Sequence, residues 1–229
     1  MAPKDLSRLA IFPLPRALLF PNAVLPLHVF EPRYRQLLAD CLASDGIIGI
    51  ACLHGGDPSK EPDDDFELPG SNDLERPLVR RLVGVGTIVA HEALEDGRSN
   101  IILKGLGRAR IDDELPIAPG RAYRRVQAIW VRDHVLPSEH EASARQTLVA
   151  LAGELADRLP EGGDTLRSLV GSQPNAGALS DLLAAALVTA PEERLRMFET
   201  VDVQRRSDGV AEAIATALAT LADPDQAMN

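Results

Sequence analysis

Two cysteines and two histidines are the residues near the start of the chain whose types suit metal chemistry. Cys41, Cys52, His28 and His54 could bind zinc through thiolate sulfur and imidazole nitrogen. Neither C-x-x-C nor H-x-x-x-H spacing organises them, so the sequence favours packed thiols and surface histidines. We expect both cysteines to be reduced and buried, and we expect no bound metal or cofactor.

Two further groups of charged residues suggest acid–base or cation chemistry, but their spacing is wrong. His91-Glu92 and Asp133-His134 are adjacent pairs, and adjacent side chains on a strand point to opposite faces. An acidic run over residues 61–67 lacks the alternate ligands and the glycine of a calcium loop, which favours a solvated charge run. Neither pattern predicts a catalytic site.

Motifs for ATP hydrolysis and proteolysis are also missing from the sequence. No G-x-x-x-x-G-K-[ST] occurs, so nothing offers the backbone cradle and lysine that hold ATP phosphates. The lysines are Lys4, Lys60 and Lys104, and a serine–lysine pair would need Lys104 on a predicted strand, where no motif nominates a serine. We therefore predict that the chain is not an enzyme. An undetected hydrolase is the weaker alternative, and it would need a nucleophile and a base within hydrogen-bond reach in one pocket.

Prolines determine the structure expected for residues 11–53, where any binding residues must be positioned. They stand at positions 13, 15, 21, 26 and 32, and each removes a backbone donor and fixes φ, which forbids a long helix here. We predict short, extended, buried pieces between them. Glu31-Pro32 then opens a helix that ends at Gly46, and residues 47–53 form a buried strand. The helix buries Tyr34, Leu37, Leu38 and Cys41.

The pattern of the chain changes twice after this stretch. Residues 54–76 are rich in Asp, Glu, Pro and Gly and predict a long loop, whereas residues 78–133 predict strands with a type I′ hairpin turn at Asp96-Gly97. From about residue 134, Ala, Leu and Glu dominate and predict four or five helices packed as a bundle. The candidate helix starts are Ser138 with Glu141, Asp164, Asn175, Thr189 with Glu192, and Asp202.

The order of motifs through the chain resembles one known family, the amino-terminal substrate-binding domain of the Lon proteases. The motifs are Phe12-Pro13-Leu14, Leu19-Phe20-Pro21, Leu25-Pro26-Leu27 and Phe30-Glu31-Pro32-Arg33-Tyr34-Arg35, followed by segments around residues 85–88, 94–97, 105–111, 179–187 and 202–203. The match covers about the whole chain and looks most like the stand-alone members without ATPase or protease domains. One departure is Ser207-Asp208-Gly209, where relatives usually carry an apolar residue, and we expect the last helix to be bent or loosely packed there.

The resemblance implies an α+β fold in two parts. Residues 1–133 are expected to form a PUA-like mixed β pseudo-barrel with an inserted helix, and residues 134–229 a C-terminal α-helical bundle. It also implies a non-catalytic module that binds protein or peptide segments, including unfolded or degron-like ones, and that acts with a separate ATP-dependent protease.

Charge and composition limit the classes of partner and the cellular compartment that we expect for the protein. The 229 residues carry a net charge of −10, and no run of eighteen apolar residues or signal-peptide core occurs, so we expect a bacterial cytoplasmic protein without membrane contact. Nucleic acid is disfavoured, because binding it requires a strong basic face. RNA binding by a PUA-like barrel is nevertheless the alternative function, and its candidate contacts are Arg108, Arg110, Arg121, Arg124 and Arg125.

The candidate binding residues all lie in or just after the proline-rich stretch, because extended chain beside a barrel can offer an edge to an incoming peptide. An alternative interpretation is purely structural: Tyr34 packs on the barrel, Arg33 pairs with Glu31 or a carbonyl, and Phe20, Leu27 and Phe30 fill the core. The candidates for partner binding are Phe20, Leu27, His28, Phe30, Glu31, Arg33, Tyr34 and Arg35.

Overall fold

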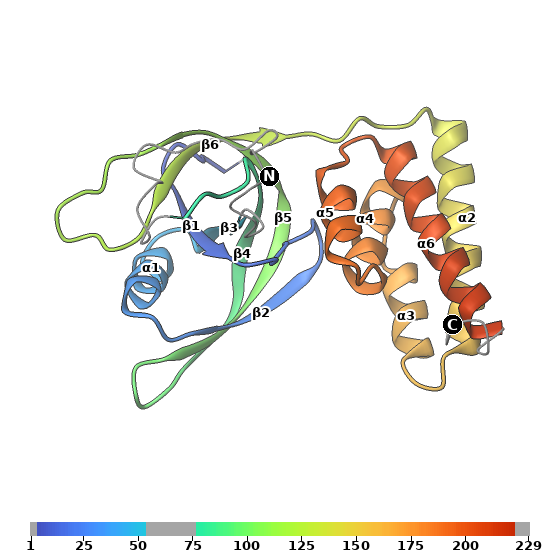
Figure 1. Cartoon of the computed structure of the whole chain (residues 1–229), viewed down its shortest axis with the longest axis horizontal. Coiled ribbons are helices and arrows are strands. Elements are labelled where there is room, and N and C mark those ends of the chain that lie inside the picture. Colours follow the sequence, from blue (N-terminus) through green and yellow to red (C-terminus); the bar gives the residue numbers. More distant parts are fainter. Residues whose placement is uncertain (1–3, 54–76, 223–229) are drawn as a thin grey trace, which may run out of the picture. The chain divides into compact units, whose positions relative to one another are not determined.

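The computed structural model of the chain describes residues 4–53 and 77–222. Two compact units divide the chain, Met1–Val131 and Arg132–Asn229, and each is considered by itself. Within the described residues, the first unit contains six strands and one helix, and the second contains five helices; Figure 1 shows these elements. The long loop predicted over residues 54–76 lies outside the described residues.

Five strands of the first unit close on themselves. The strand order is β2-β5-β4-β3-β1-β6, and a further pairing of β5 with β6 completes the circuit, which leaves β2 attached to β5 outside it (Figure 1). β1 and β3 run parallel, and the other pairs are antiparallel. The elements are β1 (Leu9–Leu14), β2 (Val24–Val29), α1 (Pro32–Leu42), β3 (Ile47–Cys52), β4 (Leu82–Ala93), β5 (Ser99–Glu114) and β6 (Arg125–Val131).

The proline-rich stretch is extended, as predicted, but it is only partly buried. β1 is buried along nearly its whole length, whereas β2 alternates, with Val24, Pro26 and His28 exposed. The prediction of burial was wrong for β2, because among the described strands it pairs with β5 alone and so lies at an edge of the sheet.

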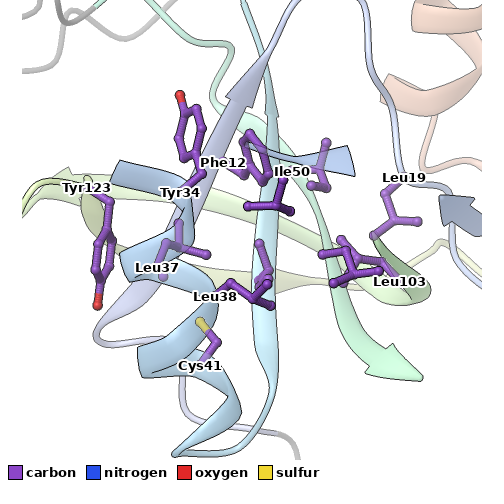
Figure 2. Close-up of a cluster of buried hydrophobic side chains, with 13 residues drawn as sticks. Phe12, Leu19, Tyr34, Leu37, Leu38, Cys41, Ile50, Leu103 and Tyr123 are labelled. Atoms are coloured by element: carbon purple, nitrogen blue, oxygen red, sulfur yellow. The ribbon is translucent and has the colours of Figure 1, made fainter. Parts of the chain in front are cut away.

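Helix α1 packs its apolar side onto the sheet and encloses a hydrophobic cluster of described residues of the first unit. Tyr34, Leu37, Leu38 and Cys41 are buried, as predicted, and the Tyr34 ring stacks on Phe12 with ring centroids 4.0 Å apart (Figure 2). The second cluster fills the inside of the closed circuit with aliphatic side chains. Its members include Leu6, Ile11, Val83, Val85, Ile111 and Val126.

Both cysteines are free and buried, as the sequence predicted. The Cys41 thiol donates to the Ile47 carbonyl oxygen at 3.4 Å, and burial, with smaller contributions from Asp45 and Asp40, raises the pKa of Cys41 to about 12. The thiolate is the reactive form, so the fraction of Cys41 that can react at pH 8 is very small.

Alkylation of Cys41 is therefore expected to be about a thousandfold slower in the folded protein than in urea at pH 8, since burial raises the pKa of its thiol to about 12 and unfolding exposes it. The measurement is mass spectrometry of the iodoacetamide adduct over time, in a Cys52→Ala background so that one thiol is read. Labelling of the folded protein at the unfolded rate would contradict the buried position of Cys41.

The turn between β4 and β5 differs from the predicted type. Gly97 has a φ of +77°, but Asp96 does not have a positive φ, so the type I′ prediction was wrong. The Gly97 N–H donates to the Leu94 carbonyl and the Leu94 N–H to that of Arg98, which makes a three-residue loop with glycine in the left-handed position.

Five helices are found in the described part of the second unit. They are α2 (Ser138–Arg158), α3 (Gly163–Gly171), α4 (Ala176–Leu187), α5 (Pro191–Glu199) and α6 (Val203–Ala222). Asn175 and Asp202 accept backbone N–H bonds at the starts of α4 and α6, as predicted. The other three predicted starts were wrong, because the residues before α2, α3 and α5 are Pro137, Gly162 and Ala190.

Residues 207–209 lie inside α6, which is helical from Val203 to Ala222. The expectation of loose packing there was wrong. Ser207 is buried, and a Cβ on Gly209 would lie 3.0 Å from the Met197 sulfur and still nearer its methyl carbon. Glycine at this position therefore allows Met197 of α5 to pack against the α6 backbone.

Candidate functional site

The eight predicted binding residues do not form one site. Phe20 is fully buried and Tyr34 is buried, whereas Phe30 is 57% exposed. The remaining residues divide between two hollows on the first unit and the turn at Gly97. The buried placement of Phe20 and Tyr34 agrees with the structural interpretation of these two residues.

The first hollow lies at the start of α1, and we call it the α1 hollow. It has a volume of about 620 Å³, and its lining includes Glu31, Arg33 and Tyr34. The Arg33 guanidinium lies 2.7 Å from the Glu31 carboxylate and 4.9 Å from the centre of the Tyr34 ring. The pKa of the Tyr34 hydroxyl is raised, and burial is the largest cause. The rest of the lining is Pro13, Leu14, Pro15, Pro32, Leu53, Pro77, Ile117, Ala122, Tyr123 and Arg124.

Arg124 lines the α1 hollow, and its guanidinium is already bonded to other groups of the protein. Its Nε lies 3.0 Å from Glu114 Oε1, and its Nη1 donates to the Pro77 carbonyl at 2.8 Å. Both members of this ion pair are buried. Because the guanidinium already has a carboxylate and a carbonyl as partners, the α1 hollow does not favour an anionic ligand.

The second hollow lies on the exposed surface of three adjacent strands, and we call this surface the β2–β5–β4 face. Pro26 of β2, Ile102 of β5 and Ala90 of β4 lie opposite one another in register and form its apolar centre. Val24 and Ile102 are 63% and 39% exposed. The hollow has a volume of about 590 Å³ and is lined by Pro26, Leu27, His28, Ala90, His91, Glu92, Asn100, Ile101 and Ile102.

A row of polar side chains closes one end of this face. His28 Nδ1 lies 2.8 Å from Asn100 Oδ1, and the Asn100 amide donates to Glu92 at 2.8 Å. The Phe30 ring stacks on His28 with centroids 6.0 Å apart. His91 Nε2 instead lies 3.2 Å from Ser99 Oγ, so His91 and Glu92 have different partners. The face is thus an exposed apolar strip with one polar end, a combination that suits binding rather than proton transfer.

Arg35, like Phe20 and Phe30, lines neither hollow. It is exposed, and its guanidinium covers Gly97, where a Cβ would collide with it. The Arg35 side chain therefore packs against the turn between β4 and β5.

Three strand glycines that the sequence reasoning did not single out hold the segment leading into β2. A Cβ on Gly84 would overlap the Leu19 carbonyl oxygen, and a Cβ on Gly105 would overlap the Phe20 carbonyl oxygen. A Cβ on Gly86 would overlap the Leu19 side chain. The signal was present, because glycine inside a strand often marks close approach of another backbone. These contacts position β2 and so the β2–β5–β4 face.

Neither a metal-ligating cluster nor a membrane-spanning helix is found among the described residues. The described part of the chain contains no cluster of three or more histidine, cysteine, aspartate or glutamate side chains that could hold a metal ion. Within residues 4–53 and 77–222, no helix is long and apolar enough to cross a membrane.

Comparison with known proteins identifies the class to which this fold belongs. Residues 8–216 match the family described as the ATP-dependent protease La (LON) substrate-binding domain. The chain belongs to this family, and the resemblance seen in its motifs is confirmed.

Bacterial Lon proteases are among the relatives of the chain. The chain is 28% identical over 207 residues to Lon protease 2 of Myxococcus xanthus and 29% identical over 209 residues to Lon protease of Anaeromyxobacter dehalogenans. Each alignment covers 90% of this chain and 23% of the relative. The chain therefore spans about a quarter of the length of these relatives.

Solved structures of Lon amino-terminal domains have the same fold. The N-terminal domain of Mycobacterium avium complex Lon protease superposes with a TM-score of 0.67 at 17% identity, covering 91% of this chain and 98% of that one. The Lon N-terminal domain protein from Xanthomonas campestris gives 0.56 at 21% identity, covering 88% and 95%. The mixed α+β fold with a six-stranded sheet and six helices is thus that of Lon amino-terminal domains.

Proposed function

We propose that the chain recognises segments of other polypeptides, unfolded or degron-like ones among them, without hydrolysing them itself. The observation that carries the proposal is the match of residues 8–216 to a substrate-binding domain. The exposed apolar centre of the β2–β5–β4 face supports it, because contiguous exposed apolar surface commonly marks a site of protein contact.

A separate ATP-dependent protease in the cytoplasm is the partner that we propose. The relatives are Lon proteases in which the matched region is 23% of the length, and this supports a protease as the partner. We also propose that residues 1–133 form a PUA-like pseudo-barrel and residues 134–229 a helical bundle, each a subdomain. The closed strand circuit supports the first assignment, and the five helices support the second.

The arginines do not support RNA binding, the alternative function. Arg108 and Arg124 are buried, and Arg124 is paired with Glu114. Two of the five candidate arginines are therefore not available to phosphates, which leaves the basic surface weaker than the sequence suggested.

The test of this function is binding to lysozyme that has been reduced and carboxymethylated so that it stays unfolded. We expect saturable binding by fluorescence anisotropy, and no binding of native lysozyme. Ile102→Lys is expected to weaken binding about tenfold, because it removes apolar contact area worth about 1–2 kcal/mol at the centre of the face.

A matched control is available at Ile129. It is also an exposed strand isoleucine of the first unit, 50% exposed on β6, and it is not among the residues that line the β2–β5–β4 hollow. Ile129→Lys is expected to bind as the wild type does. Equal loss in both variants would point to general charge repulsion, and no saturable binding by the wild type would refute the proposed function.

A further inference from the structure

The hydrogen-bond register of β2 shows which of its backbone groups face away from β5. The Gly105 N–H donates to the Ala23 carbonyl at 2.8 Å, and the pairing continues from Val24 opposite Lys104 to Val29 opposite Ser99. Bonded and non-bonded pairs alternate in an antiparallel ladder. Positions 25, 27 and 29 therefore direct their backbone groups to β5, and positions 24, 26 and 28 direct theirs away from it.

Pro26 agrees with this register, because a residue without an N–H is tolerated where the backbone faces away from the neighbouring strand. In the described part of the chain, β5 is the only strand that pairs with β2. The outer edge of β2 thus presents two donors, the N–H groups of Val24 and His28, and three acceptors, the carbonyls of Val24, Pro26 and His28.

Donors and acceptors alternating along an edge are satisfied by one class of ligand, an extended polypeptide backbone. We propose that β2 binds an extended substrate segment of about five residues as an additional strand, a proposal that rests on the proposed function. Side chains of the added strand would continue the row of Val24, Pro26 and His28 on one face and meet the partly buried Leu25 and Leu27 on the other. The preferred segment is therefore apolar, β-branched and free of proline, as in an unfolded chain that normally buries its strands.

Pro26 favours a substrate over a second copy of this chain. Two β2 strands paired antiparallel with 24 opposite 28 would place Pro26 opposite Pro26, and that central pair would lose both N–H donors. A substrate segment opposite Pro26 loses only one donor. A proline at an edge is a known means of limiting self-pairing.

The decisive measurement is amide hydrogen exchange of this protein, read by NMR, with and without carboxymethylated lysozyme. We expect the amides of Val24 and His28 to become protected at least tenfold on binding. The amides of Leu25 and Leu27 already face β5, so their protection should change little.

Proline substitutions test the same hydrogen bonds by affinity. Val24→Pro and His28→Pro each remove one outward donor and are expected to weaken binding about three- to tenfold, while Val24→Ala and His28→Ala keep the N–H and separate the side-chain contribution. Pro26→Ala restores a donor and should tighten binding severalfold. Thermal melts within a few degrees of the wild type establish that each variant is folded.

The outcomes separate the two proposals. If the wild type does not bind carboxymethylated lysozyme, the proposed function fails and the edge proposal with it. If the wild type binds, but proline and alanine variants bind alike and the Val24 and His28 amides stay unprotected, only the edge proposal is overturned. Concentration-dependent protection of those amides without ligand would assign the edge to a second copy and also overturn it.

Discussion

Replacing Arg206 with methionine is expected to lower the free energy of unfolding of the helical unit by about 3–5 kcal/mol. The Arg206 side chain is fully buried in α6 and lies against two carboxylates: its Nε is 3.0 Å from Asp181 Oδ1, and its Nη2 bonds Asp133 Oδ2. It also donates to the Ser180 hydroxyl at 3.1 Å and to the Thr200 carbonyl at 2.5 Å. Methionine would fill the space but leave the buried Asp181 without its cation.

Urea unfolding followed by circular dichroism at 222 nm measures this loss, because the helical unit supplies most of the helix. The matched control is Arg205→Met, one residue earlier on the exposed side of α6, where we expect a change of less than about 0.5 kcal/mol. Adding Asp181→Asn to Arg206→Met should recover part of the stability, since it removes a buried negative charge that has lost its Arg206 partner. Equal stability of the Arg206 and Arg205 variants would show that the buried network contributes nothing.

The helical unit illustrates which local signals are reliable. Asn175 and Asp202 cap their helices because each accepts a backbone N–H three residues ahead, an interaction contained in four residues of sequence. The capping box at Ser138 fails because the Glu141 carboxylate accepts the N–H of Ala176, 35 residues away. Arg206 was missed for the same reason, since one of its carboxylate partners, Asp133, is 73 residues away.

For the candidate site, the sequence indicated the right stretch but not the exposure of its residues. The run of residues 24–29, VLPLHV, has no polar alternation, so it predicted a buried strand. Which strand lies at an edge depends on pairings with β5, more than seventy residues later. Pro26 was the one local indication of an edge, because proline in a strand requires a neighbour on one side only.

Replacing Gly105 with alanine is the substitution in the first unit from which we expect the largest loss, about 3 kcal/mol or more. A Cβ there would overlap the Phe20 carbonyl oxygen and lie 2.9 Å from its carbonyl carbon. Backbone atoms cannot rotate away as a side chain can. Both backbone groups of Gly105 also bind the segment before β2, since its carbonyl accepts from Asn22 at 2.9 Å and its N–H donates to Ala23 at 2.8 Å.

Relief of this overlap requires the Phe20 segment to move off the sheet, which would break those two bonds and release the start of β2. We therefore expect Gly105→Ala to weaken binding of carboxymethylated lysozyme as well as stability. The single tryptophan, Trp130 of β6, reports urea unfolding of the first unit by fluorescence. Gly107→Ala is the control on the same strand, because its Cβ would meet only the Trp130 ring, at 3.0 Å, and that side chain can shift. If Gly105→Ala is no more destabilising than Gly107→Ala, the glycine contact does not position β2.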